Sequence, residues 1–209
     1  MAMLMHVKGL GRMMRDQQRK HWERYAGTDL TDRTLAIVGL GQVGSEVARL
    51  AKAVGMHVIG TSRHSVTGIV DQFFPREKLH DMLPLAEFLV LIVPHTPLTE
   101  KMIGTPELDL LPRGAYLINI ARGSIIDEPA LIRSLQSGQL SGAALDVFEH
   151  EPLSQDSPLW EMPNVLVSPH SGSTSDRENH RLTDLFCDNL RRYLNNEKLR
   201  NVLDPERMY

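Results

Sequence analysis

Apolar residues near the start of the chain follow two different periods. Residues 34–40 read TLAIVGL, an almost continuous apolar run that is typical of a strand buried on both faces. Residues 41–54 repeat their apolar positions at helical spacing, and Gly55 ends the helix. These positions are Val43, Val47, Leu50 and Val54. Residues 56–61 return to the strand pattern, so the order predicts a βαβ unit with a right-handed crossover.

The alternation of strand and helix patterns continues along the rest of the chain. Further strands are predicted at 88–94, 115–121, 141–148 and 164–169. Further helices are predicted at 76–87, 105–111, 128–138 and 173–196. The region 62–75 is ambiguous, and a weak strand around Ile69–Val70 is an alternative there. Strands and helices in turn predict an α/β fold, a Rossmann-type, doubly wound and mostly parallel sheet.

The patterns predict three segments. A helical arm covers residues 1–30, the Rossmann-type domain covers 31–196, and a C-terminal tail covers 197–209. We expect the arm, which is rich in Met and Arg, to find few partners in the sheet domain. The long C-terminal helix carries one apolar stripe, with Cys187 beside it as a packed thiol. The stripe consists of Leu182, Leu185, Phe186, Leu190, Tyr193 and Leu194.

Composition and charge exclude several classes of protein. The chain is 42% hydrophobic and 23% charged, which is ordinary for a soluble globular protein. Its formal net charge of -3 gives no reason to expect a nucleic-acid partner. The single cysteine excludes an internal disulfide and a cysteine metal cluster. Neither a membrane-spanning length of apolar residues nor a signal-peptide pattern is found, so we predict a cytoplasmic protein without a membrane partner.

A glycine motif marks the first predicted turn between strand and helix. Residues 39–44 read GLGQVG, which matches G-x-G-x-x-G directly after a buried strand and at the start of a helix. Gly39 permits the tight turn, Gly41 lets the backbone approach a pyrophosphate, and Gly44 lets helix and strand pack closely. The helix N-terminus offers free N–H groups to the phosphates. The motif therefore predicts a dinucleotide site.

The end of the second predicted strand bears on the choice of dinucleotide. NAD-type sites place an acidic residue there, but the expected position is Ser62, and Arg63 follows it. An Arg can pair with a 2′-phosphate in a fork, so we favour NADP over NAD. A solvated Arg63 with NAD still preferred is the alternative.

Charged residues follow three later predicted strands. They are Arg122 after the strand at 115–121, Glu149 and Glu151 after the strand at 141–148, and His170 after the last. Because ligands of open α/β sheets bind outside the carboxyl ends of the strands, these residues should share one edge with the dinucleotide. Hydride addition to a carbonyl develops negative charge on oxygen, which calls for a cation and a proton donor. A metal site would need ligands near His170, and no metal-ligand spacing supports one, so we expect no metal.

Several motifs in this order resemble the D-isomer-specific 2-hydroxyacid dehydrogenases, especially their glyoxylate and hydroxypyruvate reductase branch. The resemblance covers about residues 30–195. It rests on GLGQVG (39–44), VPHTPLT (93–99), GAYLINIARGSIIDEPAL (114–131), ALDVFEHEPL (144–153) and SPHSGS (168–173). Together these motifs are far more specific than the glycine motif alone.

The resemblance implies a role for each reacting group. Arg122 would bind the substrate carboxylate and polarise the 2-oxo group, His170 would be the acid, and Glu151 would be the carboxylate partner of His170. For Glu149 we expect a solvent-facing side chain. The expected cofactor contacts are Gly39, Gly41, Gln42, Val43, Gly44, Ser62, Arg63, Pro94, His95, Thr99, Ile120, Ala121, Asp146 and Gly172.

The resemblance implies an oxidoreductase that transfers a hydride between NAD(P)H and a small 2-oxo acid such as glyoxylate or hydroxypyruvate. The family normally has an N-terminal substrate domain that this chain lacks, so a catalytically weak NAD(P)-binding or sensing module, or an inactive fragment, is the alternative. Family enzymes commonly dimerise through the cofactor domain, so we also expect a homodimer that uses the N-terminal arm.

Overall fold

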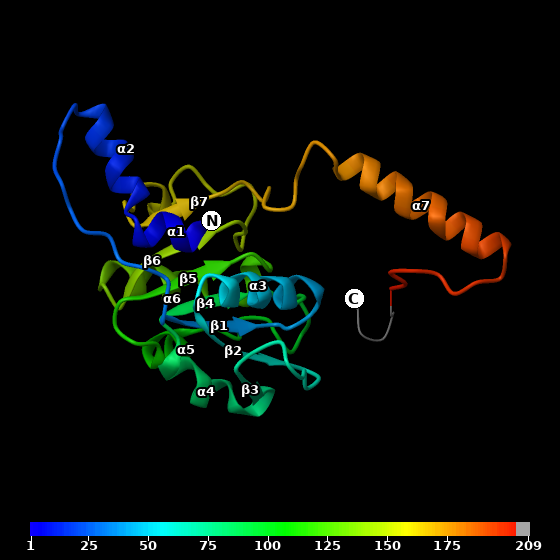
Figure 1. Cartoon of the computed structure of the whole chain (residues 1–209). Helices are drawn as coiled ribbons and strands as arrows, with labels where there is room; N and C mark the ends of the chain where they lie inside the picture. Colours follow the sequence, from blue (N-terminus) through cyan, green and yellow to red (C-terminus); the bar gives the residue numbers. More distant parts are fainter. Residues whose placement is uncertain (204–209) are drawn as a thin grey trace. The chain divides into compact units, whose positions relative to one another are not determined.

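A seven-stranded sheet forms the centre of the larger part of the molecule (Figure 1). In the computed structural model all neighbouring strands are parallel, and their order is β3-β2-β1-β4-β5-β6-β7. The strands are β1 (Thr34–Val38), β2 (His57–Ser62), β3 (Gln72–Pro75), β4 (Phe88–Leu91), β5 (Ala115–Asn119), β6 (Leu140–Leu145) and β7 (Val165–Val167). The predicted doubly wound α/β fold is confirmed.

The structure describes residues 1–203, and its internal contacts divide the chain into two units. The first unit is Met1–Pro169, and the second begins at His170. The relative positions of the units are not determined, so each is described by itself. The expected boundaries after residues 30 and 196 stay predictions, and residues 204–209 of the expected tail lie outside the described residues.

Helices and short 3-10 turns connect the strands of the first unit. The helices are α1 (Ala2–Val7), α2 (Leu10–Gln18), α3 (Gln42–Ala53), α4 (Leu79–Met82), α5 (Thr105–Leu110) and α6 (Glu128–Gln136). The 3-10 turns are η1 (Arg76–Lys78), η2 (Leu83–Leu85), η3 (Gly123–Ile125) and η4 (Pro158–Trp160). Most predicted elements are found with boundaries shifted by a few residues.

Two predictions for the segment between β2 and β4 are wrong in detail. The helix expected over residues 76–87 is broken into η1, α4 and η2, because Pro84 has no N–H to donate to the preceding turn. The weak strand considered around Ile69–Val70 is β3, which begins at Gln72 and pairs with β2 from Ile59 onward.

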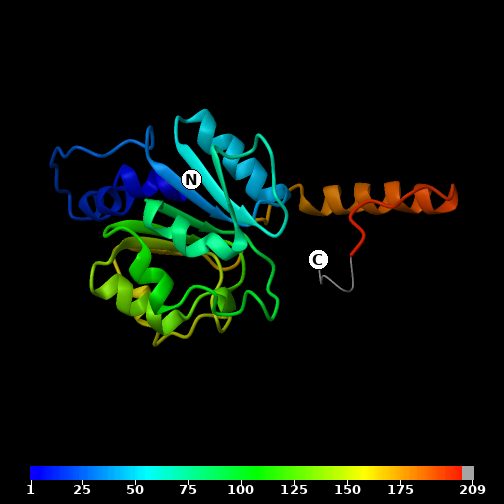
Figure 2. The ribbon, with the colours of Figure 1, turned by 90° about the horizontal axis from the view of Figure 1, so that it is seen from below.

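Each face of the sheet carries its own hydrophobic core, because successive side chains along a strand point to opposite faces. Leu35 and Ile37 of β1 belong to a core shared with α3. Ala36 and Val38 belong to a second core, shared with α4, α5 and α6. Figure 2 shows the sheet between α3 on one side and the helices α5 and α6 on the other. The apolar run of β1 is therefore buried on both faces, as its sequence predicts.

The helix α1 packs on the same core as α3, so the expectation that the arm finds few partners is wrong for this helix. Val7 is buried in that core together with Leu30. The ring of His6 stacks on the ring of Tyr116 in β5, with the centroids 4.0 Å apart. The carbonyl of Val7 accepts a hydrogen bond from the N–H of Thr28 at 2.9 Å. The helix α2, in contrast, buries none of its residues.

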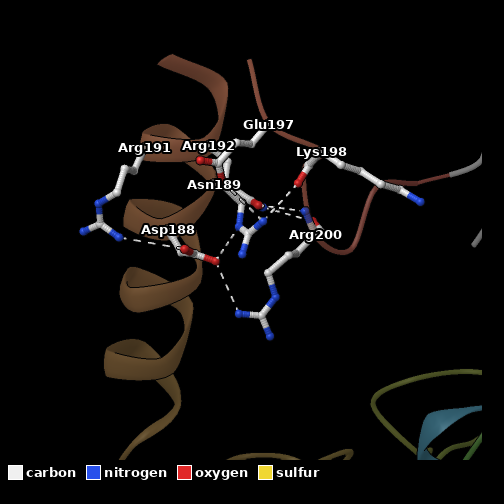
Figure 3. Close-up of polar contacts among 7 residues, drawn as sticks. All are labelled: Asp188, Asn189, Arg191, Arg192, Glu197, Lys198 and Arg200. Carbon is white, nitrogen blue, oxygen red and sulfur yellow. Dashed lines mark hydrogen bonds and ion pairs between the residues drawn. The ribbon is translucent and has the colours of Figure 1, made fainter. Parts of the chain in front are cut away.

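The second unit contains the turns from His170 onward, the helix α7 (Glu178–Leu194) and the segment that follows the helix. Figure 3 shows the polar contacts between α7 and that following segment. The carboxylate of Asp188 accepts hydrogen bonds from Arg192 Nε at 2.9 Å and from Arg200 Nη1 at 3.3 Å. Asn189 and the backbone of Arg200 exchange two further hydrogen bonds, at 2.8 and 3.0 Å. These contacts turn the segment after α7 back along the helix.

The helix α7 begins later than residue 173, where the sequence predicts its start. Its N-cap is Arg177, and the residues before it form turns. Several members of the predicted apolar stripe, including Phe186 and Tyr193, are exposed. Cys187 is exposed as well, so the expectation of a packed thiol is wrong.

Candidate functional site

The carboxyl ends of the strands form one edge of the sheet, which is where ligands of open α/β sheets bind. The strand register places Leu91 beside both Val38 and Asn119, and it places Leu145 beside both Asn119 and Val167. The residues that directly follow these positions therefore lie in one row along the edge. They are Gly39, Ile92, Ile120, Asp146 and Ser168.

The glycine turn lies at this edge, between β1 and α3. Gly39 has a φ of 111°, and a Cβ there would collide with the carbonyl of Ile92. A Cβ on Gly44 would collide with the carbonyl of Gly39, so the turn and the helix approach each other only because both residues are glycine. A Cβ on Gly41 would meet nothing within 4 Å, and the backbone there faces open space. The turn thus has the shape that a pyrophosphate requires.

The helix α3 presents its first turn to the same space. It begins at Gln42 after the N-cap Gly41, and no side chain of the described residues caps it. The first N–H groups of a helix have no partner within the helix, and they carry the positive end of its dipole. Gln42 and Val43 are exposed in this turn. The predicted cofactor contacts over residues 39–44 therefore lie together, and their geometry suits a phosphate group.

The end of β2, where the adenosine ribose of a dinucleotide would lie, has no carboxylate in its sequence. Ser62 is the last residue of β2, and its hydroxyl donates a hydrogen bond to the carbonyl of His64 at 2.6 Å. Arg63 follows and is exposed. The nearest acidic residue along the chain in this direction is Asp71, which accepts from the N–H of Val58 at 2.8 Å, near the opposite end of β2. Asp71 is therefore held away from the ribose end of this strand.

The loop after β4 is held together by Thr99. Thr99 is buried, and its hydroxyl donates to the carbonyl of Pro94 at 2.7 Å and accepts from the N–H of Thr96 at 2.9 Å. Pro94 and His95 are exposed on the same loop. The structure therefore gives Thr99 a part in shaping this loop, while its expected contact with the cofactor stays a prediction.

Asn119 shapes the turn that carries Arg122. Asn119 ends β5 and is only 1% exposed. Its Nδ2 donates to the carbonyl of Arg122 at 3.1 Å, and its Oδ1 accepts from the N–H of Ala121 at 3.0 Å. Arg122 is exposed, and its Nη1 donates to the carbonyl of Ala121 at 2.7 Å. Of the expected cofactor contacts in this turn, Ile120 is exposed and Ala121 is buried.

The loop that carries Glu151 lies against the turn of Arg122. A Cβ on Gly123 would collide with the backbone of Phe148, so the two segments approach closely only because this residue is glycine. Glu151 Oε1 accepts a hydrogen bond from the N–H of Phe148 at 3.0 Å. The structure thus brings the segments of Arg122 and Glu151 together at the carboxyl edge.

The sequence suggested a solvent-facing side chain for Glu149, but the structure does not show one. Its side chain is partly buried, and Oε1 lies 3.1 Å from Lys101 Nζ. This ion pair raises the pKa of Lys101. Glu149 therefore fastens its loop to the segment around residue 101.

Asp146 and Ser168 form a polar pair at the same edge. The hydroxyl of Ser168 donates to Asp146 Oδ1 at 2.5 Å, and the N–H of Ser168 donates to the carbonyl of Leu145 at 2.9 Å. The predicted cofactor contact Asp146 is thus held by a residue that the sequence analysis did not select. Both Ser168 and Asn119 are polar residues at the end of an apolar strand, and this pattern could have identified them.

The remaining expected site residues, His170 and Gly172, belong to the second unit. His170 has a φ of 52°, in the left-handed region that few residues other than glycine adopt. Because the two units are not placed relative to each other, the grouping of His170 with Arg122 and Glu151 stays a prediction.

The described residues contain neither a metal-binding cluster nor a membrane-spanning helix. Within residues 1–203, no group of three or more His, Cys, Asp or Glu residues is arranged to hold a metal ion. In the same range, no helix combines the length and the apolar character that crossing a membrane requires.

Comparison with known proteins identifies a dinucleotide-binding domain. Residues 1–172 match the family model described as "D-isomer specific 2-hydroxyacid dehydrogenase, NAD binding domain". The chain belongs to the D-isomer-specific 2-hydroxyacid dehydrogenase family. It contains the NAD(P)-binding domain of that family, and the predicted membership is confirmed.

Individual members of this dehydrogenase family are similar over most of the chain. A D-3-phosphoglycerate dehydrogenase of Methanocaldococcus jannaschii is 32% identical over 206 residues, which are 97% of this chain and 39% of that protein. A glyoxylate/hydroxypyruvate reductase B of Klebsiella pneumoniae is 37% identical over 182 residues, which are 86% of this chain and 56% of that protein. The chain spans about half the length of such curated relatives.

A solved dehydrogenase structure has the same fold. The D-isomer-specific 2-hydroxyacid dehydrogenase of Xanthobacter autotrophicus Py2, in complex with NADPH and MES, superposes with a TM-score of 0.89 at 36% identity. The match covers 100% of this chain and 86% of that one.

Proposed function

We propose that this chain is the cofactor-binding part of an NADPH-dependent reductase of small 2-oxo acids such as glyoxylate or hydroxypyruvate. The observation that carries the proposal is the position of Arg122. Asn119 holds the backbone of Arg122 at the carboxyl edge of the sheet, beside the loop of Glu151 and on the same edge as the glycine turn, and the guanidinium itself donates to the carbonyl of Ala121. A cation at this place suits an anionic substrate whose carbonyl oxygen gains charge in the reaction.

Arg122 would bind the substrate carboxylate and polarise its oxo group. One of its terminal N–H groups is used on the carbonyl of Ala121, which leaves Nη2 and Nε for the substrate. The bound dinucleotide would supply the hydride to the carbonyl carbon. Stabilisation of the developing negative oxygen by Arg122 lowers the barrier of this addition.

His170 would deliver the proton that completes the reduction. An imidazolium near neutral pH needs a nearby carboxylate that favours its charged form, and Glu151 is the expected partner. In the first unit Glu151 accepts a hydrogen bond from the N–H of Phe148, which fixes the direction of its carboxylate.

The preference for NADP rests on the end of β2. Ser62 stands where an NAD site would have a carboxylate, and Arg63 is exposed next to it. A 2′-phosphate would meet no repulsion from a carboxylate of this strand and could pair with the guanidinium. The Xanthobacter autotrophicus relative binds NADPH, which supports the same choice.

Relatives with two different activities support the proposed substrate class. The Klebsiella pneumoniae relative is a glyoxylate/hydroxypyruvate reductase, and the Methanocaldococcus jannaschii relative is a D-3-phosphoglycerate dehydrogenase. Arg122 suits the 2-oxo or 2-hydroxy carboxylate that these substrates share. We favour a small 2-oxo acid, as the motifs suggest.

We also propose a cytoplasmic homodimer that uses the N-terminal arm. The helix α2 buries none of its residues, and Met13 and Met14 on it are exposed, as is Trp22, at 94%. A second copy of the chain would cover these apolar side chains. Sedimentation velocity over a range of concentrations tests the assembly, and a monomer mass at every concentration would refute it.

The function is tested by measuring turnover and dinucleotide binding on the same preparations. Wild type, Arg122→Gln and His170→Ala are assayed for NADPH oxidation with glyoxylate and with hydroxypyruvate, and NADPH binding is measured by fluorescence. We expect turnover in the wild type, its loss in both variants, and unchanged NADPH binding. Tight NADPH binding by the wild type without turnover would refute the reductase and favour a sensing module.

A further inference from the structure

A cavity lies at the amino ends of the strands, on the edge of the sheet opposite the glycine turn. Its volume is about 310 Å³, at the lower end of the range for sites that bind small molecules. Arg33 and Glu87 directly precede β1 and β4, while Tyr116 and Ser141 are the second residues of β5 and β6. The wall is completed by His6 from α1 and by Arg113 from the loop before β5.

The hydroxyl of Tyr116 in this cavity has no hydrogen-bond partner among the described residues. Tyr116 is only 4% exposed, and it lines the cavity. Its ring is fixed between the stacked ring of His6 and the edge of Phe88, whose centroid lies 6.2 Å away. Among residues 1–203 nothing forms a hydrogen bond with this hydroxyl. Within the described part of the chain only the hydroxyls of Thr61 and Ser134 are fully buried without a partner, so the Tyr116 hydroxyl is open to solvent in the cavity, where a ligand oxygen can accept its hydrogen bond.

The same hydroxyl is a donor at all physiological pH values. Burial raises the pKa of Tyr116 to about 12, so the phenol keeps its proton. The matching ligand atom is an acceptor, and a negatively charged oxygen is the strongest acceptor for such a group.

The charges around the cavity leave one cation without a counterion. Arg33 Nη1 and Glu87 Oε1 are 2.6 Å apart, and Glu87 Oε2 also accepts from the N–H of Thr34 at 2.9 Å, so these charges are neutralised. Arg113 donates only to the carbonyl of Ser137, at 3.4 Å, and has no carboxylate partner among the described residues. The net charge of the lining is therefore positive, and Arg113 is its source.

His6 contributes a neutral ring and an ordered hydrogen bond. Its Nε2 lies 3.2 Å from the hydroxyl of Ser141, which in turn lies 3.2 Å from the carbonyl of Ala115. Because a hydroxyl has one proton and the carbonyl can only accept, Ser141 donates to Ala115 and His6 donates to Ser141. Burial, and secondarily the charge of Arg33, lower the pKa of His6 and keep the ring neutral.

We propose that this cavity binds a small oxyanion, a carboxylate or a phosphate, through the guanidinium of Arg113 and the hydroxyl of Tyr116. The site is separate from the dinucleotide edge and does not depend on the proposed reductase function. One wall of it belongs to α1, so a bound anion would also hold this helix against the sheet. Its occupant is free inorganic phosphate or a small carboxylic acid.

The test is a titration of the full chain, labelled with ¹⁵N on arginine, with potassium phosphate and separately with sodium acetate. Ionic strength is kept constant with chloride, and the Nε–H signals are followed by NMR. We expect a saturable shift of the Arg113 signal with a Kd on the order of 1 mM for at least one anion. The anion that saturates identifies the source as phosphate or carboxylate.

Two variants and a matched control make the test specific. Tyr116→Phe keeps the ring contacts but removes the hydroxyl, and Arg113→Gln removes the charge from an exposed side chain. We expect each to weaken anion binding by about tenfold, the value of one charge-assisted hydrogen bond. In Arg113→Gln the affinity is read from the signal of Arg33, which lines the same cavity. Arg133→Gln, on the exposed surface of α6, should leave the affinity unchanged. A shift that never saturates, or equal affinities in all variants, would overturn the proposal.

Discussion

The side chain of Asn119 offers the sharpest test of how the turn that carries Arg122 is built. Asn119→Ala removes two hydrogen bonds, to the N–H of Ala121 at 3.0 Å and to the carbonyl of Arg122 at 3.1 Å. The bond to Ala121 is buried, and loss of its acceptor leaves an unsatisfied N–H that costs about 1–3 kcal/mol. The second bond is partly buried, so water can replace it and its loss costs about 0.5–1.5 kcal/mol. The free energy of unfolding should fall by roughly 2–4 kcal/mol.

The same substitution should make the position of Arg122 less defined and leave the structure of the glycine turn unchanged. Urea unfolding measures the stability, NADPH fluorescence measures cofactor binding, and steady-state kinetics measure KM and kcat for glyoxylate. We expect the KM for glyoxylate to rise about tenfold and the dissociation constant of NADPH to rise by less, because Ile120 and Ala121 are the only expected cofactor contacts in this turn.

Asn164→Ala is the matched control for this experiment. Asn164 also donates one partly buried hydrogen bond to a backbone carbonyl, that of Ser141 at 3.3 Å, but it lies away from the turn of Arg122. Its loss should cost no more than about 1 kcal/mol and leave the KM unchanged. If Asn119→Ala behaves like this control in both measurements, Asn119 does not hold Arg122 in place.

Four further substitutions probe the glycine turn, the ribose end and an ion pair. Gly44→Ala should destabilise the fold by about 1–3 kcal/mol in urea unfolding, because its Cβ collides with a backbone carbonyl. Gly41→Ala should keep full stability and lose NADPH affinity. Equal stability losses in the two variants would contradict this expectation. Arg63→Ser should weaken NADPH binding by about tenfold and leave NADH binding unchanged, and equal losses for both would argue against a 2′-phosphate contact. The hydrogen bonds from Lys52 and from the N–H of Val58 lower the pKa of Asp71. The ion pair of Asp71 with Lys52 therefore stabilises the fold at pH values above the unfolded-state pKa of Asp71. This stabilisation is lost as the pH falls through the folded-state pKa of Asp71. Asp71→Asn should therefore unfold at lower urea concentration at neutral pH and show less additional loss on acidification, and an unchanged pH dependence would exclude this contribution.

The features that the sequence predicted well depend on local constraints. The turn at residues 39–44 is fixed by backbone contacts of its own glycines, and the motif records this directly. The strand β1 is apolar throughout because both of its faces are covered. In contrast, Pro84 breaks the helix expected over 76–87, although the apolar spacing continues past it.

Features that depend on distant contacts were not predictable in the same way. The docking of α1 rests on His6 and Tyr116, which are far apart in sequence, and neither residue signals the other. The role of Asn119 appears only when its partners in the following turn are seen. The chemistry of Arg122, Glu151 and His170 followed from a family resemblance, and the structure joins the first two at one edge.

The parallel pairing of β1 with β4 has a consequence for how the chain folds. Their contacts, including the ion pair between Arg33 and Glu87, bridge residues 54 positions apart, and the chain between them must first build α3 and β2. Closing such long loops before the pairing energy is gained slows folding. During synthesis the edge of β1 that pairs with β4 therefore stays unpaired until β4 has been synthesised. The sequence has to keep this edge from pairing with other chains during that interval.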